Sequence, residues 1–159
     1  MNWEARFKDF FSQKDFNLQG CSLFIFRDDG IPMYGVTSNL DRNTVGALMA
    51  GSWQAAKALS SFIPVKEKSK EEIFRFSFDT SERGVYILPF SIDKNSFLLG
   101  IIFQEQDNPG LVKSRMRQIL EKLLHHVENI KESMSQKEKF LFNEISDKEI
   151  DRLFSFERN

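Results

Sequence analysis

Apolar positions along the chain recur with two periods, one typical of helices and one typical of strands. Helical spacing appears three times, and it predicts one short amphipathic helix and two longer ones. The first apolar stripe consists of Trp3, Phe7, Phe10 and Phe11. The second helix is expected to run from a cap at Asp41 or Asn43 to about Phe62. The third is expected from about Leu111 to Met134.

Alternating or continuous apolar runs predict five strands. They cover residues 21–27, 32–37, 73–79, 84–90 and 96–103. The turn Asp28-Asp29-Gly30 joins the first two as a hairpin, and short turns join the last three as a meander. The order α-β-β-α-β-β-β-α therefore predicts an α+β sandwich, in which helices cover both faces of a five-stranded antiparallel sheet. Pro89 lacks a ladder donor, so we expect it at the end of the fourth strand or in a bulge.

The C-terminal residues form a separate pattern. We expect one domain over residues 1–134 and a linker with a C-terminal docking segment over 135–159. Ser146 and Glu149 have the spacing of a capping box, and an apolar helical stripe follows them. The whole motif comprises Ile145, Ser146, Glu149, Ile150, Leu153 and Phe154. A helix this short is marginal in water, so it either folds onto its own domain or docks on a partner protein.

Composition narrows the class of protein. The 159 residues contain 41% hydrophobic residues and carry a formal net charge of -1, which gives no reason to expect nucleic acid or an anionic membrane surface as a partner. A single cysteine, Cys21, excludes an intrachain disulfide and fits a reducing compartment. The chain begins without a long apolar run that would indicate a signal peptide, so we expect a cytoplasmic protein.

Residues that could carry catalysis or bind a cofactor do not form a recognisable set. The segment Gly46–Ser52 has the glycine spacing of a phosphate loop, but it lacks the lysine and lies inside a helical pattern. His125 and His126 are adjacent on a predicted helix and point about 100° apart, which does not suit a shared metal. Cys21 is more simply explained as buried filler than as a nucleophile. We therefore expect no cofactor, no metal and no enzyme activity of the chain's own.

Two elements favour contacts with other proteins. The second helix is rich in glycine and alanine between Gly46 and Ala58, although each glycine costs a helix about 1 kcal/mol relative to alanine. These small residues allow either tight packing on the chain's own sheet or close approach by another protein. The third strand, if it lies at the sheet edge, offers unpaired backbone groups to a second copy. Its predicted interface residues are Ile73, Arg75 and Ser77.

Three segments resemble one known family. They are residues 43–56 of the second helix, residues 109–116, and the tail at 144–155. Together they resemble the bacterial roadblock (dynein light chain) family, and the tail is similar to the extension of members that regulate a Ras-like polarity GTPase. The resemblance implies a roadblock/profilin-like sandwich that forms a homodimer. Third strands would pair across the two-fold axis, and second helices would lie side by side on one face.

The resemblance also implies a function. It implies a GTPase-activating or scaffolding partner of a small Ras-like GTPase in bacterial cell polarity or gliding motility, with a location at a cell pole. The GTPase would dock on the second helix, with the tail as an additional contact, and hydrolysis would proceed without an arginine finger. The expected docking residues are Ala47, Ala50, Gly51, Gln54, Ala55 and Ala58. Two alternatives are an adaptor whose tail docks a receiver or other signalling protein, and a ligand sensor with a pocket lined by phenylalanines.

Overall fold

The computed structural model describes residues 2–13, 16, 19–36, 40–64, 74–105 and 108–143, of which residues 137–143 are described by their backbone only. The chain divides into two compact units, Met1–Leu123 and Leu124–Asn159. The sheet, the first two helices and the start of the third helix belong to the first unit. All of the surfaces discussed below lie in that first unit.

The three helices begin at side-chain caps. Helix α1 spans Trp3–Ser12, α2 spans Arg42–Ser60 and α3 spans Pro109–Asn143. Asn2 Oδ1 accepts from the Ala5 N–H at 3.2 Å, Asp41 Oδ2 accepts from the Thr44 N–H at 2.8 Å, and Asn108 Oδ1 accepts from the Leu111 N–H at 3.2 Å. Each cap satisfies an N–H group that has no partner within its own helix. The expected cap at Asp41 is thus confirmed.

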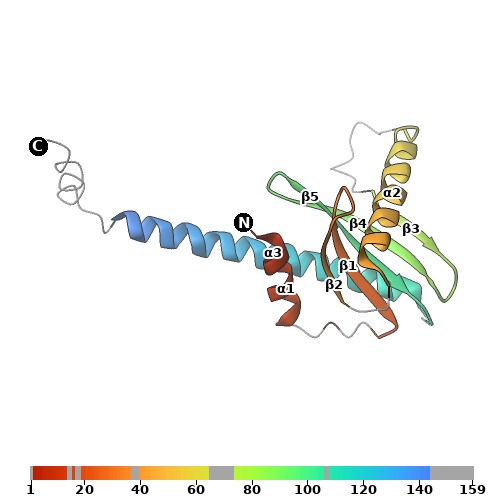
Figure 1. Ribbon diagram of the computed structural model, residues 1–159, viewed down its shortest axis with the longest axis horizontal. Coiled ribbons are helices and arrows are strands. Elements are labelled where there is room, and N and C mark those ends of the chain that lie inside the picture. The colour runs from red at the N-terminus through yellow and green to blue at the C-terminus, as the bar shows by residue number, and fades with distance from the viewer. Residues whose placement is uncertain are drawn as a thin grey trace, which may run out of the picture. The chain divides into compact units, whose positions relative to one another are not determined.

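The strands form one antiparallel sheet in the order β2-β1-β5-β4-β3 (Figure 1). They are β1 (Cys21–Arg27), β2 (Pro32–Val36), β3 (Phe76–Asp79), β4 (Gly84–Ile92) and β5 (Asn95–Phe103). The expected five-stranded antiparallel sheet is confirmed, and β3 lies at its edge.

Two details of the strands differ from the sequence prediction. Strand β3 begins at Phe76 rather than at Ile73, which lies outside the described residues. Pro89 lies inside β4, opposite Leu98, and not at the strand's end or in a bulge. Proline is tolerated there because β3 begins at Phe76, opposite Ile87, and does not extend to Pro89.

Helices cover both faces of the sheet. On one face, Phe7 of α1 packs edge-on against Phe97 and Phe90, with ring centroids 5.3 and 6.3 Å away. The first turns of α3 lie on the same face, since the Lys113 ammonium is 5.8 Å from the centre of the Tyr86 ring. Such offset and edge-to-face rings add to the stabilisation from burial alone. The largest fully buried side chains among the described residues are phenylalanines, which pack into the core.

The opposite face carries α2. Because side chains alternate along a strand, residues paired with Gly100 and Leu98 share that face. Its core cluster consists of Phe24, Phe26, Val45, Met49, Ala50, Trp53, Ile87 and Leu98. Gly100 leaves room for Met49, whose sulfur occupies the space where a Cβ would stand. Helix α2 is thereby held close to the middle of the sheet.

Helix α3 is longer than the sequence predicted. It continues from Pro109 to Asn143, so the predicted linker at 135–139 is helical and the expected helix end at Met134 is wrong. Polar residues there still suit a helix because lysine and glutamine are good helix formers. The docking motif from Ile145 to Phe154 lies outside the described residues. Among the helices that the structure describes, none is both long and apolar enough to cross a membrane.

Candidate functional site

Helix α2 presents three faces, and only one of them is buried. The buried face packs on the sheet and consists of Val45, Gly46, Met49, Ala50 and Trp53. A second face, at 3–4-residue spacing, carries Ala47, Gly51, Gln54 and Ala58, and all four are exposed. We call this set the outer stripe. A third face carries Leu48, Ser52, Ala55 and Leu59, and Phe62 follows in the turn after the helix; all five are exposed. We call this set the groove-side stripe.

The expected docking residues do not all lie on an accessible face. Ala50 is only 6% exposed and belongs to the core cluster, so its expected docking role is wrong. It takes part in holding α2 on the sheet instead. Ala47, Gly51, Gln54 and Ala58 are accessible on the outer stripe, and Ala55 is accessible on the groove-side stripe. Their role in docking stays a prediction.

The two glycines of α2 have different structural causes. A Cβ on Gly46 would lie 2.9 Å from Phe26 Cδ1 and closer still to the Gly30 carbonyl oxygen, so this glycine lets α2 approach the β1–β2 turn. A Cβ on Gly51 would meet no atom within 4 Å. Nothing in the packing of the described residues therefore requires glycine at position 51, although alanine would favour the helix by about 1 kcal/mol.

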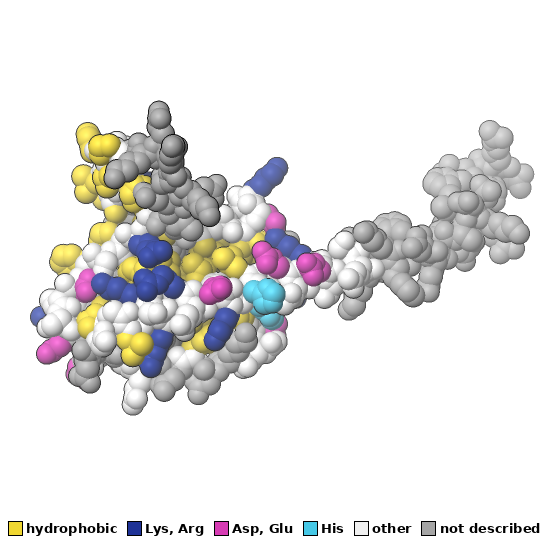
Figure 2. Space-filling view, turned by 180° about the vertical axis from the view of Figure 1, so that it is seen from behind, with side chains coloured by type: hydrophobic (Ala, Val, Ile, Leu, Met, Phe, Trp, Pro, Cys, Tyr) yellow, Lys and Arg dark blue, Asp and Glu magenta, His cyan; other side chains and the backbone are white. Residues whose placement is uncertain are grey.

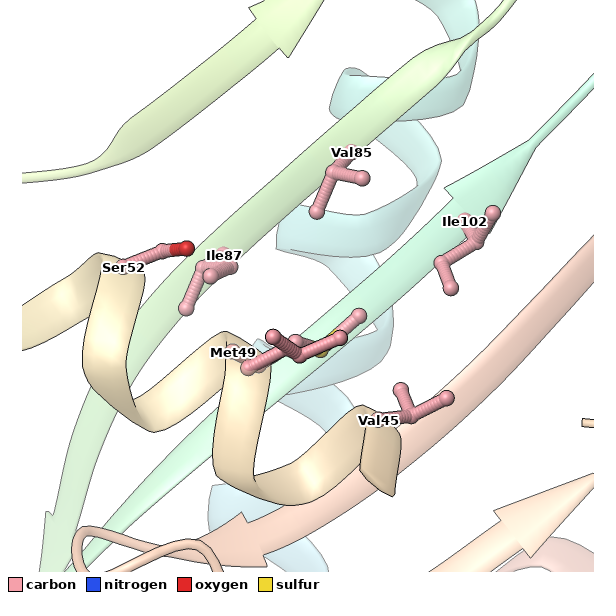
Figure 3. A pocket seen from close by; sticks show the side chains of 7 residues that line it. Val45, Met49, Ser52, Val85, Ile87 and Ile102 are labelled. Carbon is pink, nitrogen blue, oxygen red and sulfur yellow. The ribbon is translucent and has the colours of Figure 1, made fainter. Parts of the chain in front are cut away.

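An open apolar groove runs beside α2 on the same face of the sheet (Figure 3). Its volume is about 160 Å³. The lining residues are Val45, Leu48, Met49, Ser52, Val85, Ile87 and Ile102. The side chains of Val85 and Ile102 come from β4 and β5, as Figure 3 shows, and both are partly buried against the core cluster that includes α2. These residues are aliphatic apart from Met49 and Ser52, so the groove suits apolar side chains rather than a charged ligand.

The C-terminal end of α2 also exposes apolar side chains. Leu59 is 68% exposed and Phe62 is 83% exposed, and Ile63 follows in the tight turn that ends the helix. Figure 2 shows hydrophobic side chains gathered at this end of α2, at the upper left of the view. Single exposed leucines are common on protein surfaces, but a contiguous group such as this indicates a contact surface.

The edge strand β3 is accessible along its length. Ser77 and Phe78 are exposed, Phe78 by 76%, and the residue before the strand, Arg75, is exposed as well. Phe78 pairs with Val85, so its ring lies on the same face as the groove. Ser77 Oγ donates to Asp79 Oδ1 at 2.5 Å, and Lys113 Nζ donates to Asp79 Oδ2 at 2.9 Å. The hydrogen bond from the Ser77 hydroxyl is the main cause that lowers the pKa of Asp79, and the hydrogen bond from Lys113 lowers it further.

Other residues considered from the sequence have local explanations. Cys21 is half-buried, and burial raises the pKa of its thiol while Arg115 opposes that shift, so the thiol is not activated. In the β1–β2 turn, Gly30 has φ +88° and Asp29 Oδ1 accepts from the Ile31 N–H at 3.2 Å, which is turn chemistry. No cluster of three or more potential metal ligands occurs among the residues whose positions are described.

Several exposed apolar residues around α2 do not follow from its small-residue pattern. Leu48, Leu59 and Phe62 were missed because that pattern directs attention to glycine and alanine. A signal was present, since positions 48, 52, 55, 59 and 62 follow alternating steps of four and three. Val85 and Ile102 could not be identified in this way, because their exposure depends on how far α2 extends over the sheet.

The sequence matches no protein-family model and no curated protein. Comparison with solved structures, in contrast, finds clear relatives in fold. A structure described as MglB with tetrameric arrangement aligns with a TM-score of 0.56 at 15% identity, covering 80% of this chain and 91% of that chain. The gliding protein MglB from Thermus thermophilus aligns with a TM-score of 0.56 at 16% identity, covering 80% of this chain and 92% of that one.

A third similar structure is MglB from Myxococcus xanthus, with a TM-score of 0.50 at 19% identity, covering 83% of this chain and 86% of that chain. A roadblock/LC7 domain from Streptomyces avermitilis also has a TM-score of 0.50, at 9% identity, covering 67% of this chain and 84% of that chain. At these identities the likeness concerns the fold. The chain thus has the roadblock type of α+β fold that the sequence resemblance implied.

Proposed function

We propose that this chain is a homodimeric regulator of a small Ras-like GTPase of the MglA type, with no catalytic residues of its own. The partner protein would dock on the outer stripe of α2. In this proposal the chain activates GTP hydrolysis or holds the GTPase in place in bacterial cell polarity or gliding motility. The roadblock fold, shared with three MglB structures, supports the proposal at the level of architecture.

The observation that carries the proposal is Gly51. This glycine stands in the middle of α2, where it costs about 1 kcal/mol, and a Cβ there would meet open space. A glycine with no role in the chain's own packing is best explained by a protein surface that comes close to the helix. Ala47 and Ala58, one turn before Gly51 and two turns after it, keep the same face shallow.

The direct test is GTP hydrolysis by the cognate GTPase in the presence of variants of this chain. Ala47→Arg and Ala58→Arg each place a long charged side chain on the outer stripe, so each should reduce stimulation and binding by at least about ten-fold. Both positions are exposed, so the variants should remain folded. Ser12→Arg on α1, on the other face of the sheet, is the matched control. Normal stimulation by folded Ala47→Arg and Ala58→Arg would refute docking on this surface.

The C-terminal motif provides a second contact in this proposal. Leu153 and Phe154 would supply its apolar anchor, and burial of each side chain is worth roughly 1.5–3 kcal/mol before the cost of ordering the segment. Leu153→Ala combined with Phe154→Ala should weaken GTPase binding and leave the melting temperature of the isolated protein unchanged. A lower melting temperature without any partner would mean that the motif packs on its own domain.

A further inference from the structure

The part of α3 that belongs to the first unit carries an excess of positive charge. Between Pro109 and Leu123 the only acidic residue is Glu121. The cationic residues of the same stretch are Lys113, Arg115, Arg117 and Lys122. Figure 2 shows Lys and Arg side chains gathered on this side of the sheet. The formal net charge of -1 gave no indication of this, because a sum over the whole chain does not report where the charges lie.

Three of these cations have no compensating partner. Lys113 is half-buried and donates to Asp79, so its charge is neutralised within the fold. Arg115, Arg117 and Lys122 are exposed, and none of them forms an ion pair with a residue whose position is described. We call these three residues the basic surface. A single exposed cation is simply solvated, whereas three unpaired ones within two turns of helix attract an anionic partner.

The cations of the basic surface lie on both sides of α3. Arg115 lies on the side of β1, because its charge acts on the Cys21 thiol. Lys122 follows seven residues later and therefore lies on the same side. Arg117 lies on the other side, one turn beyond Lys113, which reaches the edge strand β3. At about 100° per residue, Arg115 and Arg117 are about 160° apart around the helix axis.

This arrangement fits a planar anionic partner better than a narrow one. An extended acidic peptide bound along one side of α3 would meet at most two of the three cations. A membrane surface lying on the exposed side of the helix meets all three, because long basic side chains from both sides extend to the headgroup layer. Leu111, which is 48% exposed in the first turn of α3, adds an apolar side chain at the same interface.

We propose that the basic surface of α3 is a peripheral binding site for the anionic headgroups of a lipid bilayer. Each basic residue near such a surface contributes a factor of about five in affinity, so three of them give a reversible contact. The inference is independent of the proposed GTPase. It is compatible with it, since the outer stripe of α2 lies on the opposite face of the sheet and stays accessible while α3 contacts the membrane.

Co-sedimentation of the full chain with vesicles tests the proposal. The wild-type chain should bind vesicles of equimolar phosphatidylglycerol and phosphatidylcholine, less tightly as salt is raised, and should not bind phosphatidylcholine alone. Arg115→Gln combined with Lys122→Gln should lower the affinity at least about ten-fold. Glutamine suits a helix as well as the residues it replaces, so the melting temperature should not change. Arg42→Gln combined with Lys57→Gln removes the same two charge types from α2, on the other face, and is the matched control.

A conservative variant separates headgroup attraction from recognition of a specific acidic group. Arg115→Lys should bind the anionic vesicles as wild type does, because a planar charged surface requires the charge and not the planar guanidinium group. Undiminished binding by the α3 double variant, or an equal loss in the α2 control, would overturn the proposal. Absence of wild-type binding to the anionic vesicles would overturn it as well, and binding to polyglutamate or duplex DNA instead would assign the basic surface to another class of partner.

Discussion

Replacing Gly51 with alanine should stabilise the folded chain, whereas the same change at Gly46 should destabilise it. Both glycines lie inside α2, so both substitutions gain the same helix propensity, about 1 kcal/mol. At position 51 the new methyl group meets open space and the gain is kept. At position 46 it would collide with Phe26 and with the Gly30 carbonyl oxygen. Overpacking of this kind typically costs about 1–3 kcal/mol.

Thermal unfolding of the three proteins at one fixed concentration measures the difference. A free-energy change of about 1 kcal/mol shifts the melting temperature of a chain of this size by roughly 2–4 °C, so Gly51→Ala should melt higher than wild type by that amount. Gly46→Ala should melt lower. A fixed concentration is needed because self-association makes the melting temperature depend on concentration.

Two results would refute this reasoning. A lower melting temperature for Gly51→Ala would mean that another surface already covers residue 51 in the isolated protein. A higher melting temperature for Gly46→Ala would mean that the β1–β2 turn moves away from the new methyl group without a loss of stability. In the first case the glycine would no longer support docking of a GTPase on the outer stripe.

Three further predictions concern the described core and its ionisable groups. Ser77→Ala should raise the pKa of Asp79 toward its ordinary value, which carboxyl NMR titration measures. Because the pKa of Asp79 is depressed in the folded wild-type protein, the variant should be less stable than wild type at neutral pH, and this difference should disappear as the pH falls through the folded-state pKa. Urea unfolding at several pH values measures the difference. Cys21 should react with iodoacetamide at mildly alkaline pH more slowly in the folded protein than in urea, since burial raises the pKa of its thiol; equal rates would contradict this. Phe97→Ala should cost about 3–5 kcal/mol in urea unfolding, whereas Phe62→Ala in dilute protein should change stability by less than about 0.5 kcal/mol.

Local patterns in the sequence were enough to identify most of the elements. Helix α1 and strand β1 have the predicted bounds or nearly so. The apolar pattern that predicts each of them lies within the element itself and depends on no distant residue. The cap at Asp41 was equally predictable, since a side chain that satisfies the N–H three residues later acts locally. The antiparallel sheet followed from the short turns between strands.

The end of α3 and the position of Pro89 were not predictable in the same way. Polar residues beyond Met134 have the composition of a linker, yet they are good helix formers and continue a helix that is already nucleated. Pro89 is tolerated within β4 because β3 begins opposite Ile87 and does not extend to the proline. The length of a neighbouring strand is a property of the pairing and not of the residues around the proline.

The tertiary structure decided which alanines of α2 are buried and which are accessible. Positions 47, 50 and 55 are all alanine, so no difference in side-chain hydrophobicity tells which of them lies against the sheet. Packing in one cluster with Met49 and Trp53 buries Ala50, while the other two alanines remain accessible. The sequence by itself determined that α2 is a helix of small residues. Packing on strands distant in the chain decided which of those residues another protein can reach.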